Sequence, residues 1–138
     1  MKKNKHLRFL SVSFTLLLTS CAVSYENFTV NNRNHLALLE AGMSKLDVNQ
    51  IMGNKPIKGI GAHVGNPYKT ELFKTTNGES ITIFWYYSQM NSANGHVDDD
   101  ELTPVVFKNG KMEGYGWSFY RDTHQHIDIN QKIQITND

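Results

Sequence analysis

Three groups of side chains in this sequence could do chemistry: one thiol, one pair of imidazoles and one run of carboxylates. The thiol belongs to Cys21, the only cysteine, so the chain cannot close an internal disulfide. The imidazoles belong to His124 and His126, which would point the same way on a β-strand and could share a zinc or copper ion. The carboxylates form the run Asp98-Asp99-Asp100-Glu101.

The residues before Cys21 have the order of an export leader. Four basic residues come first, namely Lys2, Lys3, Lys5 and Arg8. Residues 9–18 then form an apolar stretch, which is too short to cross a bilayer core of roughly 30 Å as a helix. Leu18-Thr19-Ser20-Cys21 resembles the bacterial lipobox, where the leader is removed and the cysteine receives diacylglycerol and fatty acyl groups. We therefore predict a signal peptide over residues 1–20, the alternative being a secretory signal with a chance cysteine.

The lipid anchor predicts where the protein works. Each buried methylene contributes about 0.8 kcal/mol, so two or three acyl chains hold a protein durably at a membrane. Ala22 follows the cysteine, and in the lipoproteins that this one resembles a residue other than Asp favours the outer membrane. We expect a lipid-anchored protein on the periplasmic face of the outer membrane, with no nucleotide available to it.

Size and charge exclude other classes. Without residues 1–20 the chain has 118 residues, enough for one domain with a modest core. The ten remaining basic residues are outnumbered by thirteen acidic ones, which gives a net charge of −3. A nucleic-acid partner would need a stripe of Lys and Arg, so we expect none.

Two short helices are expected before a sheet. Residues 21–32 show no clean period and are interpreted as the lipidated cysteine and its tether, and residues 33–40 as the first helix of a domain over 33–121. Ser44 and Asp47 have the spacing of a capping box and predict a second helix, which Gly53 would end. Residues 53–67 contain four glycines and two prolines, so we expect a loop without regular structure.

The sheet is predicted from two hairpins. Asn77-Gly78 and Asn109-Gly110 are the residue pairs that favour type I′ turns, and each stands between strand-like runs. The four predicted strands cover residues 68–75, 80–87, 102–108 and 111–119. Residues 122–138 are either a tail or an added edge strand. The fold class is therefore α+β, with two N-terminal helices packed on a three- or four-stranded antiparallel sheet.

Alternation along the strands predicts their faces. The side chains expected to cover the helices are Ile81, Ile83, Trp85, Tyr87, Tyr115, Trp117 and Phe119. A two-residue turn would pair Pro104 with Tyr115. Gly114 and Gly116 would leave bare backbone on the other face, where the ring of Phe84 or Tyr86 could lie.

Two sets of residues resemble known lipoprotein families. The run from Leu39 to Val48, followed by Ile51-Met52-Gly53-Asn54-Lys55-Pro56, resembles the "G-M-[ST]-x-x-[DE]-V…[LIM]-G-x-P" pattern of the SmpA/OmlA family of small outer-membrane lipoproteins. Here two residues precede the proline where that family often has one. The sheet half, through Asn66-Pro67-Tyr68, residues 99–111 and Gly116-Trp117, resembles an uncharacterised lipoprotein family of similar architecture. These resemblances imply helices on one face of an antiparallel sheet, and an accessory role in barrel assembly is an expectation from likeness alone.

No catalytic constellation stands out, since no serine stands in a nucleophile elbow and Cys21 loses its thiol on acylation. We therefore expect neither an enzyme nor a cofactor other than the acyl groups. Aromatic residues exceed what two helices must cover, and aromatics anchor protein interfaces. The predicted protein-binding set is Phe84, Tyr86, Asp98, Asp99, Asp100, Glu101 and Tyr120. The acidic run alone is also interpretable as a solvated loop that protects a strand edge.

The leading hypothesis is a lipid-anchored module that binds another envelope protein, as a scaffold or accessory in envelope assembly. One alternative is an inhibitor or ligand-capture module that reads its target with the loops over residues 53–67 and 88–101. A further alternative is a metal-binding lipoprotein that uses His124 and His126.

Overall fold

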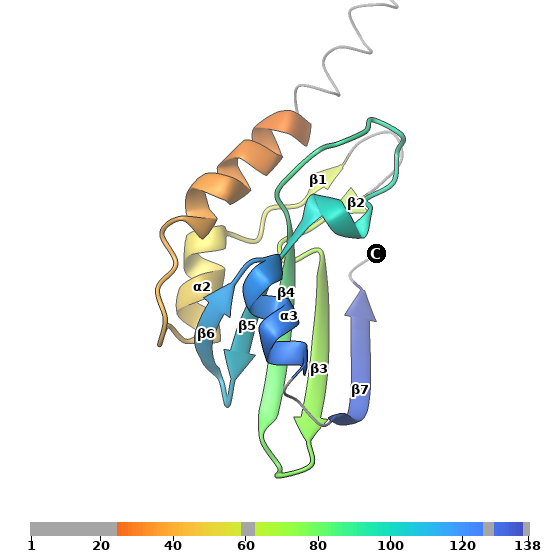
Figure 1. The fold of residues 1–138 in the computed structure, drawn as a ribbon. Coiled ribbons are helices and arrows are strands. Elements are labelled where there is room, and N and C mark those ends of the chain that lie inside the picture. Colours follow the sequence, from red (N-terminus) through yellow and green to blue (C-terminus); the bar gives the residue numbers. More distant parts are fainter. Residues whose placement is uncertain (1–24, 59–62, 126–128, 137–138) are drawn as a thin grey trace, which may run out of the picture.

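The computed structural model describes residues 25–58, 63–125 and 129–136 and has the α+β class expected from the sequence (Figure 1). A five-stranded antiparallel sheet is covered on both faces by helices. Its strands are β3 (Lys69–Thr75), β4 (Ser80–Tyr87), β5 (Leu102–Lys108), β6 (Lys111–Tyr115) and β7 (Ile129–Thr136). They lie in the order β6-β5-β4-β3-β7, so the two predicted hairpins supply four adjacent strands.

The first helix lies earlier in the chain than expected. Residues 25–36 are helical, whereas we predicted a tether to residue 32 and a helix over 33–40. Thr29, Asn32 and Leu36 are its buried positions, and they recur every three to four residues, so they form one face. That face carries two polar residues, which is why the hydrophobic pattern did not reveal it.

The second helix, α2 (Lys45–Met52), begins as predicted. The Ser44 hydroxyl accepts from the Asp47 backbone N–H at 3.2 Å, and the Asp47 carboxylate accepts from the Ser44 backbone N–H at 2.8 Å. Hydrogen bonds from Ser44 lower the pKa of the Asp47 carboxyl. Val48 and Met52, one turn apart, are buried, and the helix ends at Gly53 with a φ of 71°.

The segment after α2 is not wholly irregular. β1 (Ile57–Lys58) and β2 (His63–Val64) pair antiparallel as a separate two-stranded sheet. Our expectation that residues 53–67 lack any regular element is therefore wrong. Two residues per strand are short enough to fit between the glycines and prolines that led to that expectation.

The two hairpin turns differ. Asn109 and Gly110 have φ values of 50° and 83°, as a type I′ turn requires. At the β3–β4 turn the positive φ is found at Gly78 (85°) but not at Asn77, so the predicted type I′ turn is wrong there. The Thr75 N–H instead donates to the Glu79 carbonyl at 3.0 Å, which leaves a three-residue loop. Thr75 and Asn77 side chains hydrogen-bond within that loop.

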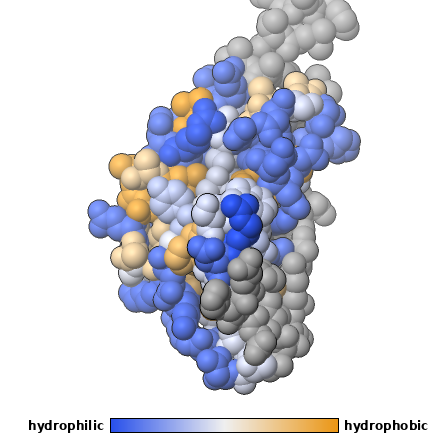
Figure 2. All heavy atoms as spheres, viewed as in Figure 1, coloured by the Kyte–Doolittle hydropathy of each residue, from blue (hydrophilic) through white to orange (hydrophobic). Residues whose placement is uncertain are grey.

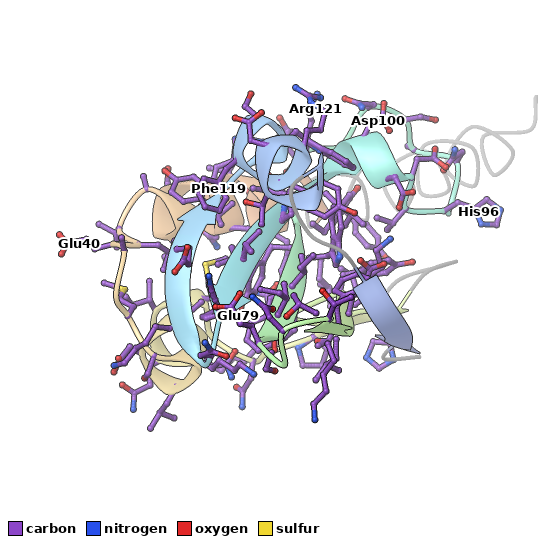
Figure 3. The ribbon with its side chains drawn as sticks, turned by 60° about the horizontal axis from the view of Figure 1, so that its bottom comes forward. Glu40, Glu79, His96, Asp100, Phe119 and Arg121 are labelled. Atoms are coloured by element: carbon purple, nitrogen blue, oxygen red, sulfur yellow. The ribbon has the colours of Figure 1, made fainter. Side chains whose placement is uncertain are left out.

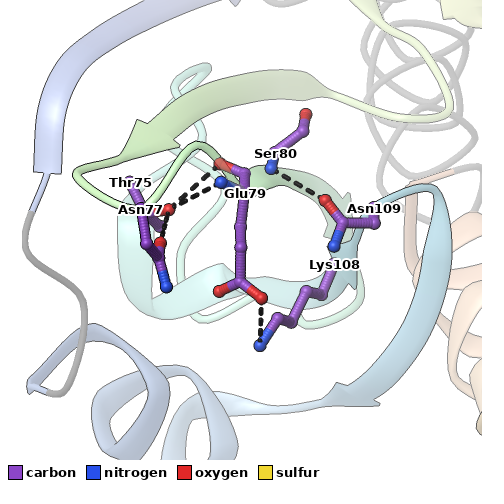
Figure 4. Close-up of polar contacts among 6 residues, drawn as sticks. All are labelled: Thr75, Asn77, Glu79, Ser80, Lys108 and Asn109. Carbon is purple, nitrogen blue, oxygen red and sulfur yellow. Dashed lines mark hydrogen bonds and ion pairs between the residues drawn. The ribbon is translucent and has the colours of Figure 1, made fainter.

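The two turns are joined to each other (Figure 4). The Ser80 N–H donates to the Asn109 side-chain oxygen at 3.0 Å, and the Asn109 N–H donates to the Ser80 carbonyl at 2.7 Å. Lys108 Nζ lies 2.8 Å from Glu79 Oε1. This end of the sheet is therefore closed by polar contacts.

The last predicted strand changes into a helix halfway. A bulge moves the β5–β6 register, since Phe107 pairs with Met112 but Val106 pairs with Gly114. Tyr115 consequently pairs with Val105, and the predicted pairing with Pro104 is wrong. The strand ends at Tyr115, Gly116 has a φ of 91°, and α3 (Trp117–Gln125) begins at once. The helices are therefore not all N-terminal.

Helix α3 corrects the predicted faces. The side of the sheet toward the N-terminal helix and α2 is here named the helix-pair face; its buried cluster is Leu36, Leu39, Val48, Met52, Phe84, Tyr86, Val105, Phe107 and Met112. The opposite side is named the tryptophan face; its buried cluster is Val64, Phe73, Ile81, Ile83, Trp85, Tyr87, Leu102 and Val106. Trp117, Phe119 and Tyr120 of α3 pack on the tryptophan face. The odd-numbered residues of β4 thus meet α3, and Phe84 and Tyr86 meet the first two helices.

The two edge strands of the sheet are β6 and β7, and within the described residues the turn before α2 covers β6. Gly42 N–H donates to the Met112 carbonyl at 2.7 Å, and Met112 N–H donates to the Met43 carbonyl at 2.8 Å, so the turn before α2 covers β6. At the other edge β7 pairs with β3. The C-terminal residues therefore form the added edge strand, one of the two predicted alternatives.

Candidate protein-docking surface

A buried carboxylate organises the long connection between β4 and β5. Glu101 is 1 % exposed, although it closes the acidic run. Its Oε1 accepts from the backbone N–H groups of Asn91 (2.6 Å) and Ser92 (3.2 Å), and its Oε2 accepts from that of Asp98 (3.2 Å). Because a buried carboxylate needs such partners, both ends of the connection are fixed to one side chain.

The other three acidic residues point into solvent. Asp99 and Asp100 belong to η1 (Asp99–Glu101), a single 3₁₀ turn, and Asp98 precedes it. Lys69 Nζ lies 2.9 Å from Asp99 Oδ1, and the side chains are 13 % and 75 % exposed. The Asn91 amide donates to Asp100 Oδ2 at 3.0 Å. The acidic turn, residues 98–100, is thus held in place while its carboxylates stay accessible.

Aromatic rings lie beside the acidic turn. Trp85 of β4 packs against Trp117 and Tyr120 of α3, with ring centroids 5.2 and 5.1 Å away. Lys69 Nζ lies 4.7 Å from the centroid of the Trp85 ring, in cation–π range. Burial, and then the nearby carboxylates of Glu71 and Asp99, raise the pKa of the Tyr120 phenol.

The structure therefore divides the predicted protein-binding set. It brings the acidic turn and half-buried Tyr120 together at one side of the molecule. Figure 3 shows Asp100 and Arg121 on the same side, with Glu40 far from them. Phe84, Tyr86 and Glu101 are 8 %, 0 % and 1 % exposed, so placing them in a docking surface is wrong. Phe84 and Tyr86 are core residues, because their rings are buried in the cluster of the helix-pair face.

The remaining site predictions fall on residues whose side chains the structure does not describe. Cys21 and His126 lie outside the described residues, and so does the side chain of His124. Among the described residues, no three His, Cys, Asp or Glu side chains could together hold a metal ion. Within the same ranges no helix has the length and apolar character needed to cross a bilayer. Metal binding by the His124–His126 pair stays a prediction.

One hydrogen-bonded contact between distant segments was not predicted from the sequence. Asn32 Nδ2 donates to Asn66 Oδ1 (3.0 Å) and to the Tyr87 carbonyl (2.7 Å), and Asn66 Nδ2 donates to Asn32 Oδ1 (2.8 Å) and the Met52 carbonyl (2.9 Å). Arg33 also donates to the Ser88 carbonyl at 2.6 Å. The N-terminal helix is thereby bound to the end of β4, where the long connection begins. On the sequence alone, Asn66 is named only as part of a family resemblance, and Asn32 lies in the predicted tether.

Apolar residues exposed elsewhere do not add to this surface. Figure 2 shows hydrophobic residues scattered around the N-terminal helix and its neighbours, among mostly hydrophilic ones. Among the residues whose exposure is described, the large apolar side chains that are exposed are Val30, Leu38, Leu46 and Tyr115. Single exposed apolar residues are normal on a soluble surface, so they do not indicate a second site.

The chain belongs to the family described as "Protein of unknown function (DUF3192)", whose model matches residues 18–122. The matched region begins within the predicted lipobox, contains both hairpins and ends in α3, so β7 lies beyond it. Comparison with curated proteins and with solved structures finds no match.

Proposed function

We propose that this member of the DUF3192 family is a lipid-anchored, non-enzymatic periplasmic module that binds another envelope protein, as a scaffold or accessory in outer-membrane or envelope assembly. The Leu18-Thr19-Ser20-Cys21 pattern supports the anchor. The binding role is supported by the way in which buried Glu101 holds the exposed acidic turn.

A fixed acidic turn is a better docking element than a mobile one. Ordering a loop at an interface costs free energy that a pre-ordered loop does not spend on binding. The three backbone hydrogen bonds to Glu101 order this connection before any partner arrives. This pre-ordering is the observation that carries the proposal.

The charges define the partner's chemistry. Lys69 neutralises Asp99, while within the described residues Asp98 and Asp100 form no ion pair. Tyr120 and Arg121 lie on the neighbouring helix, and tyrosine and arginine are common interface anchors. A basic protein surface that also offers an aromatic or apolar group fits this combination.

Site-specific photocrosslinking in intact cells tests the proposal. A benzophenone amino acid at Asp100 should capture an envelope protein, and the same group at exposed Glu40, on the remote side, should not. The double variant Asp98→Asn/Asp100→Asn should weaken capture by a probe at Arg121, whereas Glu40→Gln, which removes an exposed carboxylate on the remote side, should leave it unchanged. Equal capture at Asp100 and Glu40 would contradict a defined docking surface.

A further inference from the structure

The covalent spacer between the predicted anchor and the fold is short. Cys21 and Tyr25, the first described helical residue, are separated by four Cα–Cα steps. At 3.8 Å per step the two Cα atoms can be no more than about 15 Å apart, whatever path the chain takes. If Cys21 is acylated, as the proposed function states, residue 25 must stay close to the bilayer surface.

The start of the N-terminal helix lies at a defined end of the domain. Tyr25 and Phe28 pack against the cluster of the tryptophan face, as do Met90 and Val97 of the long connection. Figure 1 shows the beginning of this helix, the connection after β4 and the β1–β2 pair at one end, and the β3–β4 turn at the other. The eight residues of β4 alone separate these ends by about 23 Å.

The long connection at the anchored end begins with a stretch that lacks charged side chains, whereas the hairpin turns at the opposite end carry them. Residues 89–97 (Gln-Met-Asn-Ser-Ala-Asn-Gly-His-Val) contain no Asp, Glu, Lys or Arg, and residues 91–96 are exposed. The opposite end carries the Glu79–Lys108 ion pair. A segment without formal charge can approach phospholipid headgroups without removing a charged side chain from water.

From the spacer length and this charge distribution, we infer that residues 89–97 and the start of the N-terminal helix lie against the headgroups of the bilayer that holds the anchor. The hairpin turns at Gly78 and Asn109 point away from it. The acidic turn follows directly on residue 97, so it lies near the membrane surface. The partner must therefore present its basic group close to the bilayer, which narrows the proposed function.

Energy transfer from single labelled cysteines to the bilayer tests this orientation. Cys21 is the only cysteine and is consumed by acylation, so a new cysteine gives one labelled site. Ala93→Cys and Thr76→Cys are both exposed and mark the two ends. The purified acylated variants, carrying a donor dye, are placed in phosphatidylcholine vesicles with acceptor-labelled headgroups. Donor fluorescence should be lost strongly at residue 93 and weakly at residue 76.

Insertion of about ten Gly and Ser residues after Cys21 should reduce the loss at residue 93, because such a linker behaves as a flexible coil. A loss at residue 76 equal to or greater than that at residue 93 would overturn the inference and leave the proposed function standing. Mass spectrometry of the same preparations separates the two failures, since an unmodified Cys21 would remove the anchor itself.

Discussion

The two faces of the sheet are both buried, but by different chemistry. On the helix-pair face the buried cluster consists of nine hydrophobic side chains, and the buried polar groups beside them include the hydroxyls of Tyr86 and Thr82. The Thr82 hydroxyl accepts from Lys45 Nζ of α2 at 2.8 Å. On the tryptophan face the register places Lys69 opposite Trp85 and buried Glu71 opposite Ile83. This face also continues outward into the acidic turn through Tyr120 and Asp99. Adjacent residues of β4 therefore serve a mainly apolar core on one side and, on the other, a layer that contains a buried carboxylate.

The difference between the two faces indicates that the helix-pair face contributes most to the stability of the domain, and that the tryptophan face lies next to the proposed binding surface. An apolar face gains free energy in proportion to the area that it removes from water. A face that includes charged groups gains less, because each buried charge must first recover the solvation that it loses. We therefore expect changes on the helix-pair face to affect the whole domain, and changes beside the tryptophan face to act locally.

The largest expected effect is that of Phe107→Ala on the helix-pair face. Phe107 is fully buried and its ring centroid lies 4.9 Å from that of Phe84, so truncation leaves a cavity. Loss of such a side chain lowers the free energy of unfolding by about 3–5 kcal/mol, measured by urea denaturation. Leu46→Ala, at a position 65 % exposed, is the control and should cost little. Similar costs for both would contradict the assignment of this core.

Glu101→Gln is expected to cost about 2 kcal/mol and to act locally. Glutamine replaces one carboxylate oxygen with an NH₂ group, which is a donor. That group must face either the backbone N–H groups of Asn91 and Ser92 or the backbone N–H of Asp98, and none of these can accept. Hydrogen exchange should accelerate at these three amides and not in β5. Asp100→Asn, on an exposed side chain, is the matched control. Uniformly faster exchange across the sheet would mean that Glu101 supports the whole fold.

Gly114→Ala tests how closely α3 packs on the tryptophan face. A Cβ at Gly114 would lie 2.7 Å from the Phe119 ring, so the ring must move. We expect a loss of about 1–2 kcal/mol, typical of overpacking, in thermal or urea unfolding. The ring that covers this bare backbone is Phe119, rather than Phe84 or Tyr86 as the sequence suggested. Combining the change with Phe119→Ala should remove the penalty, and a persisting penalty would implicate the backbone instead.

Tyr86→Phe should stabilise the domain, by about 1 kcal/mol. The Tyr86 side chain is fully buried, its hydroxyl has no hydrogen-bond partner among the described residues, and burial raises the pKa of its phenol. Removing that oxygen leaves only hydrocarbon and sulfur in the side chains of the nine-residue hydrophobic cluster. Tyr115→Phe, on a ring 42 % exposed, should leave the urea midpoint unchanged. A destabilised Tyr86→Phe variant would reveal a partner for the hydroxyl.

Several local signals were read correctly from the sequence, whereas contacts between distant segments were not. The capping box of Ser44 and Asp47 and the bounds of β4 and β5 depend on neighbouring residues, and they were predicted. The strand predicted over residues 111–119, in contrast, ends at Tyr115. Helix α3 was missed because Tyr115, Trp117 and Phe119 alternate as a strand would, while Trp117 and Tyr120 also have helical spacing. Without α3 the sheet had one covering layer, so the wrong face of β4 was assigned to the first two helices.

The candidate site was half predictable for the same reason. The acidic run is visible in the sequence, but a run of four carboxylates does not show that the last one is buried. The burial of Glu101 depends on backbone groups of Asn91 and Ser92 that fold back ten and nine residues away. A loop that folds back in this way has no periodic pattern of residue types, so the sequence does not predict the burial of Glu101.

The reciprocal hydrogen bonds between the side-chain amides of Asn32 and Asn66 have a consequence for how the N-terminal helix is aligned on the sheet. Together the two side chains use all four of their N–H groups, on each other and on the carbonyls of Met52 and Tyr87. Apolar contacts alone would tolerate a shift of the N-terminal helix by one turn along the sheet. Such a shift would leave both side-chain amides buried without hydrogen-bond acceptors. The pair therefore selects one alignment among several that would bury similar apolar area.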